Sequence, residues 1–226
     1  MQHTAPQHSR RFSGATADDN MLKSQVMTNR VLSAAVLSAL KQVPREAFAL
    51  PGWESRAYCD SAVPTAPGRF LPQPLVFARL LQEADIRPGE KVLDVACGRG
   101  YTTQVLALLA RRVIGIDDAA MPLAWAPGQA DGCQAPRFEK TPLSRGFVDE
   151  APYDVIHING MIEALPPFIP AQLAEGGRVA FVKAIRGGLG EITIVTKVRG
   201  ALSFRPVAEG TLPRLSWGGE NVAFRF

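Results

Sequence analysis

The feature that most constrains the fold is a strand, a glycine-containing turn and a helix that follow one another in the middle of the chain. Lys91 to Ala96 is an apolar run of strand length, and the turn Gly98-Arg99-Gly100 comes directly after it. The apolar spacing from Thr102 to Leu109 then predicts a helix, and Val113 to Asp117 predicts a second strand. This unit is typical of α/β domains that bind a nucleotide-like ligand at the turn.

Alternating strand and helix patterns continue on both sides of this unit. Further strands are predicted at Asp154 to Ile158, Arg178 to Val182 and Ile192 to Val198, and helices at Leu75 to Glu83 and Pro167 to Leu173. Strands that alternate with helices predict a mostly parallel sheet with helices on both faces. The strand-like runs Ile192 to Val198 and Asn221 to Phe226 have no helix between them, which predicts an antiparallel edge. We therefore expect an α/β, Rossmann-like fold.

The length of 226 residues fits one large domain with extensions. A polar beginning predicts a disordered tail over residues 1–20, and apolar residues at helical spacing predict one amphipathic helix from Leu22 to Val43. Pro51 to Pro74 is either an ordered loop or a disordered linker. We expect the chain to divide into the tail (1–20), an N-terminal helix and substrate-type loop (21–74), a cofactor-binding core (75–199) and a C-terminal extension with an edge strand (200–226).

Charge, cysteine use and apolar run length exclude several classes of partner. The formal net charge of +4 comes from scattered basic residues, so we expect no nucleic-acid partner. Val31 to Leu40 is about half as long as a membrane span, so we expect a soluble protein without a membrane partner. Cys59, Cys97 and Cys133 are an odd number at wide spacing, which fits neither a disulfide framework nor a metal site. This predicts a cytoplasmic protein without a metal.

The glycine turn has the features of a ligand-binding loop. Gly98 and Gly100 let the backbone pass close to a ligand and direct amide groups at it. Asp117 ends the next strand about 20 residues later, which is the offset of a ribose-binding carboxylate; the alternative is that it caps the strand end. Asp94, inside the first strand, either stabilises the amino group of a cofactor or holds the backbone amides of the loop. Asn159 ends a later strand at the edge where ligands of open sheets bind.

The identity of the expected cofactor depends on the details of this turn. Thr103 stands where a dinucleotide-binding turn has its third glycine, so a nucleotide-dependent oxidoreductase is the weaker hypothesis. The turn with Asp94 before it instead resembles the first motif of S-adenosylmethionine-dependent methyltransferases, although Ala96 replaces the usual first glycine. This resemblance implies S-adenosylmethionine as cofactor. The residues predicted to bind it are Asp94, Ala96, Cys97, Gly98, Gly100, Asp117 and Asn159.

Several segments together resemble the protein-L-isoaspartate O-methyltransferase family, in the same order as in that family and over roughly Met21 to Val182. They are Val43-Pro44-Arg45-Glu46-Ala47-Phe48, Ala57-Tyr58-Cys59-Asp60 with Pro64, Gly68 and Gln73-Pro74, Arg87 to Asp94, Gly98-Arg99-Gly100-Tyr101, Ala151 to Ile158 and Gln172 to Arg178. The Tyr-x-Asp and Gln-Pro elements are specific to this family, whereas many methyltransferases share the cofactor motif.

The resemblance implies methyl transfer from S-adenosylmethionine to the free carboxylate of an isoaspartyl residue, with a protein or peptide as substrate and protein repair as the role. It also places Gln73, Tyr58 and Asp60 at the acceptor site as catalytic candidates. Tyr58 and Asp60 have an alternative role, which is to order their loop through hydrogen bonds. His157 lies inside an apolar strand, and an ionised acceptor needs no base, so we expect a packed neutral histidine.

Two positions depart from the family pattern. The family loop reads Thr-Ile-Ser-Gln-Pro, and this chain reads Phe70-Leu71-Pro72-Gln73-Pro74, so a hydroxyl that helps to position the acceptor is replaced by Pro72, which has no donor. Thr141-Pro142-Leu143 stands where the family has Gly-Asp-Gly, which leaves Glu139 as the nearest acidic candidate for the adenine. These changes favour an alternative hypothesis: a divergent S-adenosylmethionine-binding protein with a different acceptor or no catalysis.

Overall fold

A seven-stranded sheet forms the centre of the computed structural model, which describes residues 16–118 and 134–215. Its strands are β3 (Lys91–Val95), β4 (Arg112–Asp117), β5 (Arg137–Lys140), β6 (Tyr153–Ile162), β7 (Leu173–Ala184), β8 (Gly190–Val198) and β9 (Ala201–Glu209). They lie in the order β5-β4-β3-β6-β7-β8-β9. The first five of these are parallel, and β8 and β9 are antiparallel. The predicted parallel sheet with an antiparallel edge is confirmed.

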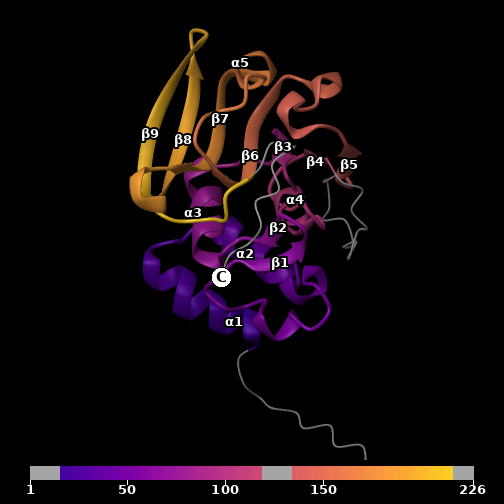
Figure 1. Ribbon diagram of the computed structural model, residues 1–226, viewed down its shortest axis with the longest axis vertical. Helices are drawn as coiled ribbons and strands as arrows, with labels where there is room; N and C mark the ends of the chain where they lie inside the picture. Colours follow the sequence, from indigo (N-terminus) through magenta and orange to yellow (C-terminus); the bar gives the residue numbers. More distant parts are fainter. Residues whose placement is uncertain (1–15, 119–133, 216–226) are drawn as a thin grey trace, which may run out of the picture.

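The helices and a separate hairpin surround this sheet (Figure 1). The helices are α1 (Ala17–Met21), α2 (Ala34–Gln42), α3 (Pro74–Ala84), α4 (Tyr101–Ala107) and α5 (Ile169–Gln172), and the hairpin pairs β1 (Val63–Ala66) with β2 (Arg69–Leu71). Short helical turns lie at Leu22–Val26, Met27–Asn29, Arg45–Phe48, Glu54–Arg56, Leu143–Arg145, Val148–Glu150 and Arg186–Gly188. In Figure 1 the strands of the main sheet lie above, and α1, α2 and the hairpin lie below.

The two faces of the sheet bury two separate apolar clusters. Side chains alternate between faces along a strand, so Val92 belongs to the cluster that contains the buried residues of α2, α3 and α4. Its neighbour Leu93 belongs to the other cluster, which includes Leu143, Phe168 and Ile169. The glycine turn after β3 is therefore anchored by a strand that is buried on both sides.

The N-terminal region differs from the prediction. Helix α1 begins at Ala17, so the end of the predicted disordered tail is helical, with the Thr16 hydroxyl accepting a hydrogen bond from the amide of Asp19; residues 1–15 lie outside the described residues. The predicted single helix from Leu22 to Val43 is wrong. Arg30 adopts a left-handed conformation with φ of 63°, which ends the first helical segment. Helix α2 begins after its N-cap residue, Ser33.

The edge of the sheet also differs. Strand β8 is antiparallel to both β7 and β9, and β9 follows a two-residue turn at Arg199 and Gly200, both with positive φ. Strand β9 is mostly exposed and contains Pro206, so neither hydrophobic alternation nor residue preference marked it as a strand. Strand β5 was not predicted either, because none of its residues is fully buried. The predicted strand Asn221 to Phe226 lies outside the described residues.

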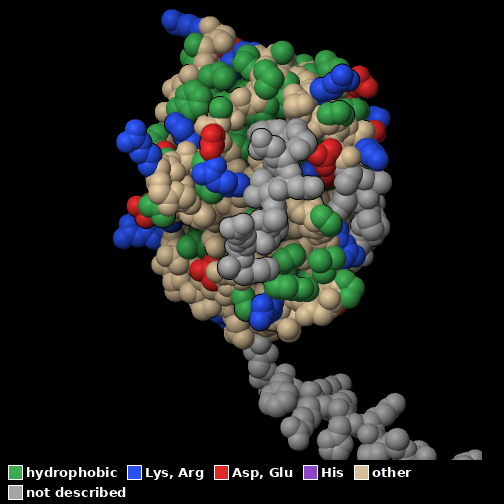
Figure 2. Space-filling view, viewed as in Figure 1, with side chains coloured by type: hydrophobic (Ala, Val, Ile, Leu, Met, Phe, Trp, Pro, Cys, Tyr) green, Lys and Arg blue, Asp and Glu red, His purple; other side chains and the backbone are tan. Residues whose placement is uncertain are grey.

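Positive and negative side chains are interspersed on the face shown in Figure 2, without one broad field of either sign. Several of the basic residues are paired with acids, including Arg112 with Glu150 and Arg205 with Glu83. Within residues 16–118 and 134–215, none of the helices has both the length and the apolar character that crossing a membrane requires. The same residues contain no group of acids, histidines and cysteines placed to hold a metal ion.

Candidate functional site

Most of the predicted cofactor residues meet at the carboxyl ends of three neighbouring parallel strands. The glycine turn follows β3, Asp117 ends β4, and Asn159 lies in β6. The order of strands reverses between β3 and β6, because β4 lies on one side of this pair and β7 on the other. Open α/β sheets bind their ligands outside such a switch point. The fold thus places the turn where the sequence predicted a binding site.

Hydrogen bonds fix the turn to the neighbouring strand β4. The amide of Cys97 donates to the carbonyl of Ile116 at 3.1 Å, and the amide of Gly98 donates to Asp117 Oδ2 at 2.9 Å. Gly98 and Gly100 have positive φ, as does Ala96, at 61°. An alanine in the left-handed region is strained. Burial raises the pKa of the Cys97 thiol, which therefore stays protonated.

Asp94 has a structural role that neither prediction described. Its buried carboxylate accepts hydrogen bonds from the hydroxyls of Thr102 and Thr103, each at 2.6 Å. It also lies 2.7 Å from His157 Nδ1. Asp94 thus connects β3 with the first turn of α4 and with β6. His157 is buried beside Phe77, as expected for a packed histidine.

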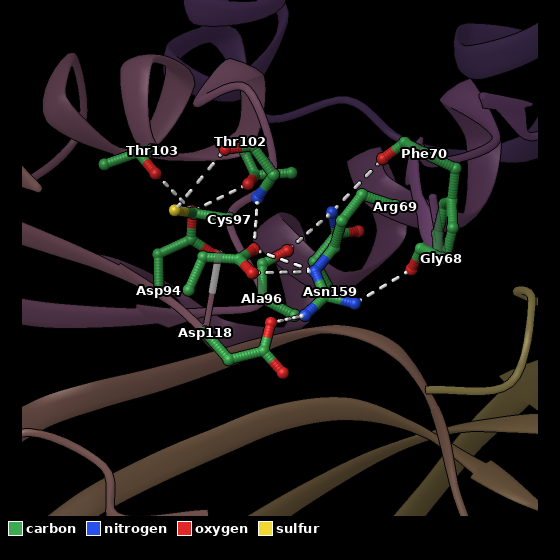
Figure 3. Close-up of polar contacts among 12 residues, drawn as sticks. Gly68, Arg69, Phe70, Asp94, Ala96, Cys97, Thr102, Thr103, Asp118 and Asn159 are labelled. Carbon is green, nitrogen blue, oxygen red and sulfur yellow. Dashed lines mark hydrogen bonds and ion pairs between the residues drawn. The ribbon is translucent and has the colours of Figure 1, made fainter. Parts of the chain in front are cut away.

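The carboxylate of Asp117 is bound by Arg69, a residue that the sequence pattern does not point to. Figure 3 shows Arg69 with its guanidinium group directed toward Asp118. Arg69 Nε lies 3.0 and 2.8 Å from Asp117 Oδ1 and Oδ2, and Nη2 lies 2.7 Å from Asp118 Oδ1. The Arg69 and Asp117 side chains are only 8% and 3% exposed. The two are 48 residues apart in sequence, and the sole signal was that Arg69 is the one basic residue between Ala57 and Pro74.

The arginine sets the charge of this carboxylate. Burial alone would raise the pKa of Asp117, but the hydrogen bond and the charge of Arg69 outweigh burial and lower it. Burial and the neighbouring Asp117 raise the pKa of Asp118. Asp117 is therefore ionised at neutral pH.

Two buried oxygen atoms near the turn have no hydrogen-bond partner among the described residues. They are Asn159 Oδ1 and Thr65 Oγ1, and their residues are 2% and 3% exposed. The Asn159 amide nitrogen donates to the carbonyls of Phe70 and Ala96 at 3.3 and 3.4 Å, which orients its oxygen. Buried polar atoms are normally paired, so these two acceptors suit a ligand that brings hydrogen-bond donors.

The three predicted catalytic residues are not brought together with the turn by any contact in the described residues. The Tyr58 hydroxyl donates to Glu46, and burial together with that bond raises the pKa of Tyr58. Asp60 is exposed. Gln73 is the N-cap of α3, where its carbonyl accepts from the amide of Phe77. Their catalytic roles stay predictions.

A buried arginine in the Val43-Pro44-Arg45 element organises the substrate-type loop. Arg45 is fully buried; its Nε donates to the carbonyl of Ala57 at 2.6 Å and its Nη2 to the carbonyl of Pro72 at 2.7 Å. Its guanidinium lies 4.8 Å from the centre of the Tyr101 ring. The family resemblance includes this element but implies no role for Arg45.

The adenine side of the expected pocket shows how the departure at residues 141–143 is accommodated. The amide of Thr141 donates to the carbonyl of Asp117 at 2.9 Å, and Leu143 is buried in the core. The carboxylate of Glu139 binds Arg137 on the same strand. Glu139 therefore has a partner in this structure, and its approach to the adenine stays a prediction.

A parallel sheet with a glycine turn and an ionised acid at its switch point defines a Rossmann-like domain that binds a nucleoside-containing cofactor. The family model described as Protein-L-isoaspartate(D-aspartate) O-methyltransferase matches residues 17–197. The chain belongs to this family.

Curated relatives carry the name of this family, and a solved structure shares the fold. The chain is 33% identical over 169 residues to a protein-L-isoaspartate O-methyltransferase of Methylorubrum populi, covering 74% of this chain and 80% of the relative. It is 37% identical over 182 residues to one from Halorhodospira halophila, with 76% and 80% covered. A Plasmodium falciparum structure of this description, in complex with S-adenosyl-L-homocysteine, has the same fold, with a TM-score of 0.70 at 16% identity over 91% of this chain and 100% of that chain.

Proposed function

We propose that this chain transfers a methyl group from S-adenosylmethionine to the carboxylate of isoaspartyl residues in proteins or peptides. The observation that carries the proposal is the family match over residues 17–197, which includes the glycine turn and Asp117 at the switch point. The relatives are named for this reaction. The unpaired Cys59 and Cys97 support a reducing, cytoplasmic setting, in which the reaction would serve protein repair.

The residues at the turn fit this cofactor in kind. The ionised Asp117 is an acceptor for ribose hydroxyls, and the unpartnered Asn159 Oδ1 is an acceptor for an ammonium group. When bound, S-adenosylmethionine supplies a methyl group on a positively charged sulfur. The acceptor carboxylate is already ionised, so the chain needs no general base. Its residues align the two reactants and exclude water.

The direct test is transfer of labelled methyl groups from S-adenosylmethionine to an isoaspartyl peptide, with the matching aspartyl peptide as control. We expect label on the isoaspartyl peptide alone, and release of the label by mild base because the product is a methyl ester. Binding of S-adenosylhomocysteine is measured by calorimetry on the same preparation. Absence of both binding and transfer would contradict the proposal.

A second candidate is a divergent protein that binds the cofactor but methylates a different acceptor or none. Pro72 favours it, because this residue has no hydroxyl and its carbonyl is already bound by Arg45. Cofactor binding without isoaspartyl transfer would support it. The variant Pro72→Ser then shows the extent of the change: a gain of isoaspartyl transfer assigns the loss to this position, and no gain assigns it to a wider part of the pocket.

A further inference from the structure

The hairpin of β1 and β2 contacts the glycine turn, and its side chains Val63, Phe70 and Leu71 are buried in the apolar cluster of α2, α3 and α4. It forms its own two-stranded sheet outside the main sheet. A Cβ atom built on Gly98 would meet Thr65 Oγ1 at 3.3 Å and Arg69 Cβ at 3.4 Å. The hairpin therefore lies in direct contact with the backbone that has to approach the cofactor.

Among the described residues, the strongest polar contacts between the hairpin and the main sheet are those of Arg69. Its guanidinium joins Asp117 and Asp118, whereas the remaining contacts of β2 with the site are neutral, such as the Asn159 amide on the carbonyl of Phe70 at 3.3 Å. Hydrogen bonds between charged groups are about twice as strong as neutral ones. The ion pair is thus the strongest polar contact between the hairpin and the strand ends at the switch point.

If the proposed function holds, the same ion pair competes with the cofactor for the carboxylate of Asp117. Both oxygens of Asp117 accept from Arg69 Nε, and Oδ2 also accepts from the amide of Gly98. Ribose hydroxyls need the same oxygens. In this structure Arg69 is therefore an internal occupant of the position that the proposed function assigns to the ribose.

We propose that Arg69 is a latch that closes the β1–β2 hairpin over the cofactor site, and that the cofactor binds only after Arg69 leaves Asp117. This inference rests on the proposed function. The protein is in equilibrium between a closed state, in which Arg69 contacts Asp117, and an open state, in which it does not. Only the open state binds the cofactor. The measured affinity is then lower than the intrinsic affinity by the fraction of open protein.

The test compares S-adenosylhomocysteine binding by calorimetry for the wild type, for Arg69→Gln and for the control Arg87→Gln. Arg87 is an exposed arginine whose carboxylate partner Asp85 is also exposed. We expect Arg69→Gln to bind on the order of tenfold more tightly, because it removes the closed state. Arg87→Gln should bind like the wild type.

The outcomes separate the latch from the proposed function. Equal affinity for the wild type and Arg69→Gln, or weaker affinity for the variant, overturns the latch and leaves the function standing. No binding by any of the proteins overturns both. Binding by Arg69→Gln but not by the wild type supports both.

A second variant keeps the test decisive if Arg69→Gln does not fold, as judged by thermal unfolding. Asp118→Asn removes the charge of one latch partner and leaves Arg69 and Asp117 in place. We expect it to tighten S-adenosylhomocysteine binding by a smaller factor than the loss of Arg69. Unchanged or weaker binding by a folded Asp118→Asn protein would overturn the latch.

Discussion

Single carboxylates in this site differ in what they do, although they lie on adjacent strands. Asp94 is fully buried and binds the hydroxyls of Thr102 and Thr103, so it serves the scaffold. Asp117 is bound by a side chain from a separate hairpin, so its partner can change without unfolding the sheet. This difference is why the proposed function assigns the ribose to Asp117, while a contact of Asp94 with the cofactor stays a prediction.

At this scale we predict that Asp117→Asn weakens binding of S-adenosylhomocysteine. The expected loss is about 1–3 kcal/mol, the scale of hydrogen bonds to a charged group. Calorimetry measures it, with the exposed Asp149→Asn as control. Asp117→Asn alters the acceptor that Arg69 and the ribose share, whereas Arg69→Gln leaves this acceptor in place, so we expect the two variants to change the affinity in opposite directions. Unchanged affinity in Asp117→Asn would show that this carboxylate does not bind the ribose.

At the scale of helices and strands, α4 packs close to the sheet. This close packing fixes the position of the glycine turn that joins β3 to α4. Gly115 on β4 has no side chain, and a Cβ there would meet Thr103 Oγ1 at 2.7 Å and Cys97 Sγ at 3.2 Å. The hydroxyl of Thr103 is one of the two that bind Asp94. The glycine thus lets the helix lie near enough to the strands for this buried contact to form.

We predict that Gly115→Ala lowers the free energy of unfolding by about 1–3 kcal/mol, the usual cost of adding a group to a packed core. Urea unfolding measures it. Gly89→Ala is the matched control, because a Cβ on Gly89 meets no atom within 4 Å and its φ is not positive. A Gly115→Ala protein as stable as this control would show that α4 shifts without cost.

Across the whole molecule, ion pairs join segments that are distant in sequence. Arg178 on β7 binds Glu90 Oε1 at 2.7 Å and donates to the carbonyl of Ala84 at the end of α3. Burial would raise the pKa of Glu90, but Arg178 outweighs it and lowers the pKa. The pKa of Glu150 is lowered chiefly by its hydrogen bond with Arg112. The pKa of Asp118, in contrast, is raised.

These shifts predict acid sensitivity. A carboxyl group with a lowered pKa in the folded state stabilises the fold above its unfolded pKa, and this stability is lost as the pH falls toward the folded pKa. We expect the free energy of unfolding to fall from about pH 5 to about pH 3. Glu90→Gln should be less stable than the wild type at pH 7, with a difference that shrinks toward pH 3. A difference independent of pH would exclude the Glu90 charge as its cause.

The sequence by itself determined the parts that depend on local pattern. Apolar runs of strand length predicted β3, β4 and the buried parts of β6 and β7, and the turn Gly98-Arg99-Gly100 and Asp117 lie at the sheet edge where the sequence placed them. Burial imposes this pattern, because a strand that is covered on both faces has to be apolar. The exposed strands β5 and β9 carry no such pattern and were not predicted.

Only the tertiary structure decided which side chains meet. The pairs Arg69 with Asp117, His157 with Asp94 and Arg45 with the carbonyl of Pro72 join residues that are 48, 63 and 27 positions apart. No local periodicity encodes such pairs. They form because the sheet and the hairpin bring the ends of distant elements to one place, and because buried charges and polar groups there need partners. The glycine turn can therefore be recognised in the sequence, but the contact of Arg69 with Asp117 cannot.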